Sequence, residues 1–317
     1  MTVGDDNMRR DPQDLYELDP AVPDLDGVPL LHHLDGFIDA GAAGRLLAEH
    51  LLGEGGHETI ARFDVDRLID YRSRRPTMTF AADRWESYEE PELAVRLLRD
   101  ASGAPFLLLT GPEPDHEWEL FTAAVRSVAD RVGAGLAVGF QGVPMGVPHT
   151  RPLGVIAYAT RPELVTTYRH MPGRLQVPGS ASALLELRLG AAGRDAAGFA
   201  AQVPHYLAQS VYPAASLKLL ESVGGTAGLD LPAGELREAS ERTNAEIDRQ
   251  VSDSAEVAEL IRRLERQYDE YAEAGRDGAG GEGLLAGQEI PTADELGAQF
   301  ERFLAEQQGR GGDSTDR

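Results

Sequence analysis

The sequence predicts an α/β protein, a three-layer α/β/α sandwich with a C-terminal helical extension. Short apolar runs typical of buried strands alternate with amphipathic stretches of helical period over most of the chain. After Pro232 the composition changes to long, charged helical patterns. The apolar run at 106–110 is uninterrupted, as expected of a strand covered on both faces, so we place it at the centre of the sheet.

The first part of the core is predicted to open with a βαβ unit. Asp39 stands immediately before the first amphipathic helix, where an acidic residue is more often an N-cap than a catalytic acid or base. An Arg-rich turn at 72–76 lies between two strand-like runs, which we interpret as a strand and an excursion. Leu93, Leu97 and Leu98 share one face of a helical pattern. The predicted elements are a strand at 30–34, a helix at 40–52, a strand at 59–63, strand-like runs at 68–71 and 77–80, and a helix at 91–102.

The second part of the core continues the alternation of strands and helices. Asp115 is predicted to cap a helix whose large apolar residues recur at helical spacing, and Gly133 is predicted to end that helix. The predicted elements are strands at 106–110, 136–140, 153–158 and 183–189, and helices at 115–132, 196–209 and 214–223.

The ends of the chain differ in composition from the core. Residues 1–26 are acidic and rich in Pro and Asp, which indicates a flexible arm with one short extended piece at 15–18. Thr292 and Glu295 have capping-box spacing before a last helix, whose apolar face we expect to dock. The partner-docking candidates on that face are Leu296, Phe300, Phe303 and Leu304. We expect a core domain at 27–231, a helical hairpin at 232–274, a Gly-rich linker at 275–290, a docking helix at 291–308 and a disordered tail at 309–317.

The charge balance argues against nucleic acid and membranes as partners. The 317 residues include 30 basic and 53 acidic side chains, giving a net charge of −23 that repels phosphate backbones and anionic lipid. No apolar run approaches the ~20 residues of a membrane-spanning helix, and the N-terminus has no apolar stretch typical of a secretory signal. We therefore expect a cytoplasmic protein.

The sequence leads us to expect no metal site and no cofactor. The chain has no cysteine, which excludes disulfides, thiolate metal sites and a cysteine nucleophile. His32 and His33 are adjacent, so on a strand they face opposite sides and cannot bind one ion together. Gly36 and Gly41 match the first glycines of a phosphate-binding loop, but the Lys and Ser/Thr that such a loop needs are missing. The G-x-S-x-G pattern of serine hydrolases is also missing.

Residues 133–158 have the character of a site or of a structured interface. Two apolar strand-like runs flank a loop that glycines and prolines constrain. Ligands of open α/β sheets bind beyond the carboxyl ends of the parallel strands, and an antiparallel pairing of 154–158 with 136–140 would place the loop there. The loop side chains either hold an anion or a chain terminus, or brace the loop by bonding to carbonyls. The ligand-binding candidates at this edge are Asp39, Gly41, Gln141, Gly142, His149, Thr150 and Arg151.

Several motifs occur in the order found in one protein family. They are LDGFIDAG at 34–41, YRSRRP at 71–76, VGFQGVPMGVPHTRP at 138–152, VPGSASALLELRL at 177–189, VPHYLAQS at 203–210 and ELGAQFERFLAEQ near the C-terminus. With these motifs the chain resembles the proteasome-assembly-chaperone-like proteins of actinobacteria, which are homologous to the second subunit of the eukaryotic assembly chaperone pair. The resemblance implies a fold similar to the purine nucleoside phosphorylase type and a homo-oligomer, with a trimer as one expected form.

The resemblance also implies proteasome subunits as partners. Relatives dock on the α-ring of the 20S proteasome, and some insert a C-terminal hydrophobic-Tyr-X sequence into its pockets, whereas this chain ends in Gly-Asp-Ser-Thr-Asp-Arg. We expect a non-catalytic, oligomeric protein that assists 20S proteasome assembly or binds proteasome-related partners. The alternative is a small-ligand-binding protein, or a phosphorylase-like or hydrolase-like enzyme, with a pocket at the carboxyl ends of the strands.

Overall fold

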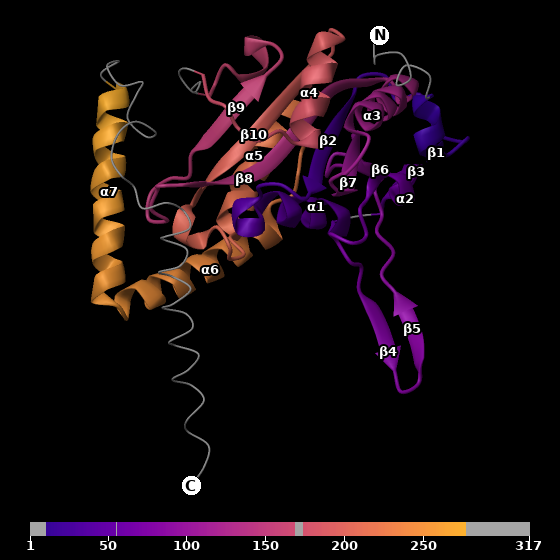
Figure 1. Ribbon diagram of the computed structural model, residues 1–317. Coiled ribbons are helices and arrows are strands. Elements are labelled where there is room, and N and C mark those ends of the chain that lie inside the picture. Colours follow the sequence, from indigo (N-terminus) through magenta and orange to yellow (C-terminus); the bar gives the residue numbers. More distant parts are fainter. Residues whose placement is uncertain (1–10, 55, 169–173, 277–317) are drawn as a thin grey trace, which may run out of the picture.

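The computed structural model describes residues 11–54, 56–168 and 174–276. Within these residues a mixed, eight-stranded sheet lies between two layers of helices, which confirms the predicted fold class (Figure 1). The strands of this sheet are β1 (Tyr16–Leu18), β2 (Val28–Asp35), β3 (Glu58–Phe63), β6 (Ala94–Arg99), β7 (Pro105–Pro112), β8 (Ala134–Met145), β9 (Val155–Ala159) and β10 (Asp195–Pro204).

The strands follow the order β1-β3-β6-β7-β2-β8-β10-β9 across the sheet. Strands β7, β2, β8 and β10 are parallel to one another, and the strands on both sides of this group pair antiparallel. The run at 106–110 lies in β7, whose residues from Phe106 to Thr110 are all buried, as the central placement predicted. Strands β2 and β3 of the predicted βαβ unit are separated in the sheet by β7 and β6.

Helices cover both faces of the sheet and enclose two apolar cores. The helices are α1 (Ala43–Gly53), α2 (Val65–Leu68), α3 (Trp118–Val132), α4 (Ala181–Ala191), α5 (Pro213–Ala227), α6 (Gly234–Ser252) and α7 (Ala255–Arg276). One core contains side chains of α3 and α4, and the other contains side chains of α1, α5 and α6. Neighbouring residues of one strand alternate between the cores, since Leu30 belongs to the first and Leu31 to the second.

Three predicted elements have the opposite secondary structure. Residues 91–102 contain strand β6 and no helix, because β6 is buried on both faces and its leucines therefore show no two-residue alternation. The predicted helix at 196–209 is strand β10, where burial in the sheet overrides the helix propensity of its alanines. The predicted strand at 183–189 is helix α4, which Ser180 caps by accepting a hydrogen bond from the Ala183 N–H at 3.1 Å.

Four local details of the structure can be compared with the sequence analysis. Residues 68–71 form the end of α2 and a turn, and no strand. Strand β9 pairs antiparallel with β10, so the conditional pairing of 154–158 with 136–140 does not occur. Asp115 does not cap α3; its carboxylate accepts the Asp70 N–H at 2.8 Å and pairs with Arg74 at 2.9 Å. Gly133 ends α3 with a φ of 76°, as predicted.

The N-terminal segment joins the sheet at its edge. The extended piece expected at 15–18 contains β1, which pairs with β3, and the side chain of Leu15 is completely buried. Residues 1–10, 55, 169–173 and 277–317 lie outside the described residues, and with them the predicted docking helix, the tail and all of the predicted linker except 275–276, which belong to α7.

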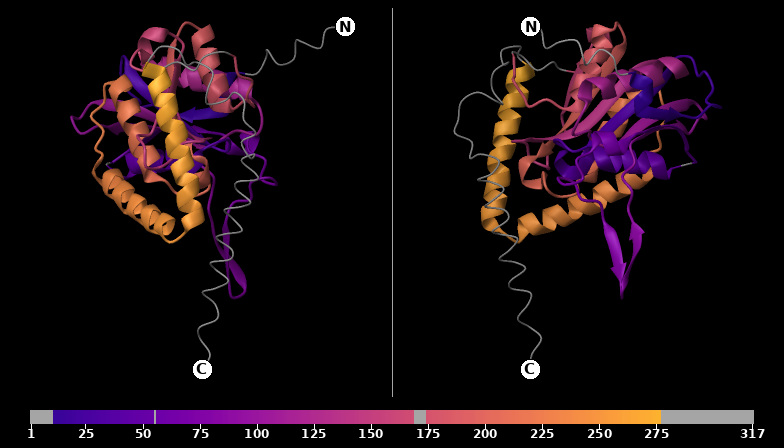
Figure 2. Two further views of the ribbon diagram at one scale, coloured as in Figure 1. Left: turned by 90° about the vertical axis from the view of Figure 1, so that its left-hand side faces the viewer. Right: turned by 45° about the vertical axis from the view of Figure 1, so that its right-hand side comes forward.

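Two segments depart from the compact core. Strands β4 (Met78–Ala81) and β5 (Arg84–Tyr88) form a separate hairpin that projects away from the large sheet (Figures 1 and 2). Helices α6 and α7 meet at a corner, and α7 does not fold back along α6, so the predicted αα hairpin is an open bend (Figure 1). Among the described helices, none is both long enough and apolar enough to cross a membrane.

Candidate functional site

The carboxyl ends of β2, β7, β8 and β10 meet at one edge of the sheet, as the sequence predicted for parallel strands. Asp39, which follows β2, holds two of the connecting loops together. Its Oδ1 accepts hydrogen bonds from the N–H groups of Gly44 and Gly142, each at 2.8 Å. Its Oδ2 accepts the Arg45 N–H at 3.0 Å. Asp39 therefore caps the start of α1, as expected, and also binds the backbone of β8.

The glycines at this edge permit close packing of the backbone. A Cβ at Gly142 would lie 2.1 Å from the Ala40 carbonyl oxygen, so this position excludes every side chain. Gly41 has a φ of 70°, and its N–H and C=O bond to Ala208 and Tyr212 at 2.8 and 2.9 Å. Gln141 is half-buried on β8 opposite Ala200 of β10. Asp39, Gly41 and Gly142 thus come together as predicted, in a tightly packed junction.

His33 points from β2 into the same junction. Its Nδ1 lies 3.1 Å from the Phe140 carbonyl oxygen and therefore carries the hydrogen of that bond. Its Nε2 faces the carboxylates of Asp35 and Asp39 at 3.4 and 3.8 Å. Burial lowers the pKa of His33, but the two carboxylates and the Phe140 carbonyl raise it by more, so the pKa lies above its ordinary value. This edge of the sheet thus favours a positive charge on His33.

His149, Thr150 and Arg151 bind side chains of the C-terminal helices α6 and α7. The Arg151 guanidinium donates two hydrogen bonds of 2.8 and 2.7 Å to the Asp269 carboxylate and one of 3.1 Å to Glu265. Thr150 donates to the same Glu265 at 2.6 Å. Hydrogen bonding to Asp269 raises the pKa of Arg151 above its ordinary value. These side chains thus fasten α7 to the loop after β8.

The imidazole of His149 belongs to a short chain of hydrogen bonds. The Tyr206 hydroxyl accepts the His149 backbone N–H at 2.8 Å and lies 2.7 Å from the His149 Nδ1. The phenolic hydroxyl can donate one hydrogen and accept two, so it suits a His149 ring with its hydrogen on Nδ1 as well as one with its hydrogen on Nε2. That Nε2 lies 3.2 Å from Asp248 of α6. The partners of His149 and Arg151 are therefore side chains of distant helices, in place of the loop carbonyls considered from the sequence.

Comparison with known proteins identifies the family of this chain. The model of the PAC2 family matches residues 33–251, which is more than half of the sequence. The chain belongs to the PAC2 family. No curated protein is similar enough in sequence to count as a relative of this PAC2 chain.

Solved structures with the same fold include actinobacterial proteins. A Mycobacterium tuberculosis protein of unknown function is 45% identical, with 94% of this chain and 97% of that chain covered and a TM-score of 0.80. A Corynebacterium glutamicum protein of unknown function is 37% identical, with 83% and 99% covered and a TM-score of 0.79. A proteasome-assembly chaperone homologue of M. tuberculosis is 23% identical, with 74% and 100% covered and a TM-score of 0.68, a likeness that shows the fold alone.

A second polar cluster of the PAC2 chain lies on the opposite face of the sheet. His32, Gly139, Gly198 and Tyr158 occupy one row across β2, β8, β10 and β9. Glu186 of α4 lies over this row, with its Oε1 3.6 Å from the His32 Nε2. His32 and His33 thus face opposite sides, as predicted from their adjacent positions.

The two glycines leave the space that this cluster occupies. A Cβ at Gly139 would lie 2.4 Å from the Glu186 Oε1 and 2.6 Å from the His32 ring. A Cβ at Gly198 would lie 2.3 Å from the Tyr158 ring. The sequence did not predict this cluster, because residues 183–189 were assigned to a strand; glycines within two apolar runs were the available signal.

The side chains of His32 and Glu186 are both buried. His32 is 1% exposed, and within the described structure neither of its ring nitrogens has a hydrogen-bond partner. Burial, followed by the charge of His33, lowers the pKa of His32 to about 4. Burial raises the pKa of Glu186 to about 8. At neutral pH the cluster is therefore a neutral imidazole beside a protonated carboxyl group.

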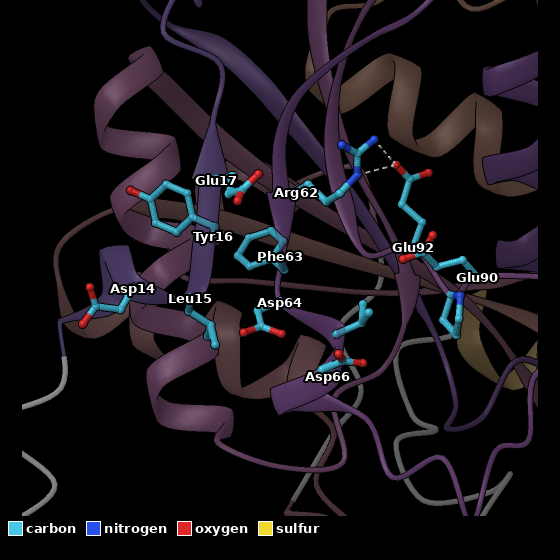
Figure 3. A pocket seen from close by; sticks show the side chains of 12 residues that line it. Asp14, Leu15, Tyr16, Glu17, Arg62, Phe63, Asp64, Asp66, Glu90 and Glu92 are labelled. Carbon is cyan, nitrogen blue, oxygen red and sulfur yellow. Dashed lines mark hydrogen bonds and ion pairs between the residues drawn. The ribbon is translucent and has the colours of Figure 1, made fainter.

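An open groove of about 680 Å³ lies beside β1 and β3, away from the predicted candidates (Figure 3). Half of its twelve lining residues are acidic, and Arg62 within it donates to Glu92 at 3.1 and 2.8 Å. The acidic side chains that line it are Asp14, Glu17, Asp64, Asp66, Glu90 and Glu92. The partner-docking candidates Leu296, Phe300, Phe303 and Leu304 lie outside the described residues and stay predictions.

Proposed function

We propose that this PAC2 protein is a non-catalytic homo-oligomer that assists 20S proteasome assembly or binds proteasome-related partners in the cytoplasm. Membership of the PAC2 family is the observation that carries this proposal. A proteasome-assembly chaperone homologue shares the fold over all of its own chain, which supports a proteasome-related role. The internal contacts of the strand-end side chains also support it, because Asp39 and Arg151 bind groups of the chain itself.

The projecting hairpin supports a function that depends on protein contacts. Met78, Phe80, Trp85 and Tyr88 of β4 and β5 are 46% to 62% exposed, and Phe80 packs edge-on against Trp85. A two-stranded hairpin is marginally stable alone in water, and clustered exposed aromatic residues mark interaction sites. We assign this hairpin to contacts with a second copy of the chain.

Affinity capture tests the proteasome role. The full chain serves as bait in a lysate of a proteasome-containing actinobacterium, and 20S α- and β-subunits are quantified by mass spectrometry. We expect enrichment of both subunits by the full chain and its loss from a bait truncated before Pro291. A Val211→Ser bait, changed at an exposed apolar residue outside the hairpin, serves as the control. Absence of proteasome subunits from the full-chain capture contradicts the proposal.

The alternative function, binding of a small ligand at the strand ends, has a separate test. A ligand held by Arg151 has to compete with the carboxylates of Asp269 and Glu265. If the chain is a binder, Arg151→Gln abolishes ligand binding while the fold survives. If it is an assembly factor, the same variant captures proteasome subunits as the unchanged protein does.

A further inference from the structure

We propose that His50, Glu54 and Glu235 form a binding site for one divalent transition-metal ion, with Zn²⁺ as the preferred ion. His50 lies in the last turn of α1, Glu54 directly follows that helix, and Glu235 lies in the first turn of α6. One ligand atom from each of the three residues lies within 4.8 Å of the others. No ion is present in the structure, and the proposal rests on the chemistry of these three groups.

The hydrogen bond of His50 fixes which ring nitrogen faces the carboxylates. Its Nε2 lies 2.7 Å from the Pro232 carbonyl oxygen, which can only accept, so Nε2 carries a hydrogen. In the neutral ring the lone pair is then on Nδ1, which lies 3.8 Å from the Glu54 Oε1. Histidines that bind metals commonly donate their other N–H to a carbonyl in this way, which fixes the ring orientation.

The site brings three hydrogen-bond acceptors close together. In the neutral tautomer the Nδ1 lone pair of His50 faces two carboxylates, and these groups repel one another. Among the described residues, no arginine or lysine forms an ion pair with Glu54 or Glu235. The carboxyl end of α1 adds the negative end of the helix dipole at the same place. A divalent ion relieves all of this repulsion at once.

The geometry and the ligand types suit zinc. Two ligand atoms on a tetrahedral zinc lie about 3.4 Å apart at bond lengths near 2.1 Å, close to the 3.8 Å between the Nδ1 of His50 and Glu54. The His50 side chain is 5% exposed and held by Pro232, whereas the exposed Glu54 and Glu235 can rotate to close the remaining distance. One nitrogen and two carboxylates leave the fourth position to water. The ion would join the end of α1 to the start of α6.

Zinc titration of the full chain tests this site. After removal of bound metal with a chelator, Zn²⁺ binding is followed by calorimetry, and Co²⁺ is used as a probe with visible absorption that reports tetrahedral coordination. We expect one equivalent of either ion to bind and the thermal unfolding midpoint to rise. Glu235→Gln and Glu54→Gln should each weaken binding by more than about tenfold, since each removes one charged ligand.

The matched control is Glu238→Gln, one turn further along α6, where the carboxylate pairs with Arg242. This variant should bind zinc as the unchanged chain does. His50→Gln is expected to abolish the Co²⁺ absorption, and circular dichroism reports whether that variant folds. The proposal is overturned if the chain binds no stoichiometric zinc, or if Glu54→Gln and Glu235→Gln bind it as tightly as Glu238→Gln.

Discussion

Glu186 is a carboxyl group that the fold holds in its protonated form. Burial raises its pKa to about 8, from an ordinary value of 4.5. Between these values the unfolded chain loses a proton that the folded chain keeps, so folding stability falls as the pH rises from about 4.5 to about 8. Taken alone, a shift of this size corresponds to about 5 kcal/mol.

The effect of His32 on the pH dependence of folding stability has the opposite sign. Burial and the charge of His33 lower its pKa from 6.5 to about 4. As the pH falls through this window, the unfolded chain takes up a proton that the folded chain does not, and stability falls. His32 and Glu186 together therefore place the greatest stability between the acid loss from one group and the alkaline loss from the other.

Replacing Glu186 by Gln should remove the loss of folding stability that accompanies rising pH. Gln has no proton to lose, so the unfolding free energy of Glu186→Gln should stay level between about pH 6.5 and about pH 8, where that of the unchanged chain falls. The acid loss from His32 should remain. Urea unfolding at several pH values measures both effects, with the exposed Glu238→Gln as control. An unchanged slope in Glu186→Gln would show that Glu186 ionises normally in the folded chain.

Gly198 is expected to resist substitution because of its neighbour across the sheet. A Cβ at this position would lie 2.3 and 2.4 Å from two ring carbons of Tyr158 and 2.5 Å from its hydroxyl oxygen. Gly198→Ala should therefore destabilise the chain by about 1–3 kcal/mol. Gly225→Ala in α5, where nothing lies within 4 Å, should stabilise it by about 0.5–1 kcal/mol.

Chemical denaturation of Gly198→Ala and Gly225→Ala measures the difference between their free energies of unfolding. Tyr158→Ala combined with Gly198→Ala separates steric overlap from other effects, since removal of the Tyr158 ring should recover part of the loss. If Gly198→Ala is as stable as the unchanged chain, the ring moves aside at little cost and the argument from space fails.

At the scale of elements, α7 is attached to the rest of the chain by polar contacts as well as by its buried side chains Ile261 and Leu264. Its polar anchors are the paired hydrogen bonds of Arg151 to Asp269, the bond of Thr150 to Glu265, and the Tyr268 hydroxyl bond to the Pro152 carbonyl at 2.9 Å. Partly exposed ion pairs contribute about 0–1 kcal/mol each, so these polar contacts add little to the cost of opening α7 locally.

Arg151→Gln should loosen α7 without unfolding the sheet. The substitution removes the guanidinium that joins Asp269 and Glu265 to the loop. We expect faster hydrogen exchange of α7 amides, unchanged exchange in β7 and β8, and little change in the thermal midpoint. Arg262→Gln removes an exposed ion pair with Glu259 within α7 itself and should leave exchange at the control level. Equal exchange in the two variants would mean that other contacts hold α7.

The sequence predicted correctly the elements that have a regular spacing of apolar residues, an uninterrupted apolar run or a residue that ends the element. Helix α3 combines regular apolar spacing with Gly133, and β7 is an uninterrupted apolar run. Strands β6 and β10 were assigned to helices because strands buried on both faces lose their alternation, which leaves helical spacing of leucines or alanines as the apparent signal.

At the candidate site, the sequence predicted contacts between residues that are close in the chain, and it missed contacts between distant residues. Asp39 precedes a helix, so its capping role follows from local sequence. The partners of Arg151 lie more than a hundred residues away on α7, and a loop sequence contains no information about them. Glu186 was hidden by the wrong assignment of α4, since a strand would have placed its side chain differently.

At the scale of the whole molecule, net charge and the exposed hairpin have opposite effects on self-association. Copies that each carry a net charge of −23 repel one another, and added salt screens that repulsion. The hairpin offers the apolar contact, because Phe80 and Trp85 are 56% and 62% exposed. Association of copies should therefore become stronger, and not weaker, as salt is added.

Removing the aromatic side chains of the hairpin should reduce the mass of the particle without harming the fold. Phe80→Ser combined with Trp85→Ser changes residues that are largely exposed within one chain, so the free energy of unfolding should change little. Light scattering after size exclusion should give a multiple of the chain mass for the unchanged protein and the mass of one chain for the double variant. Val211→Ser, at a 52% exposed apolar residue outside the hairpin, should keep the larger mass. A double variant that keeps the larger mass would place the contact between copies on another surface, and an unchanged protein that is a monomer at high salt would contradict self-association itself.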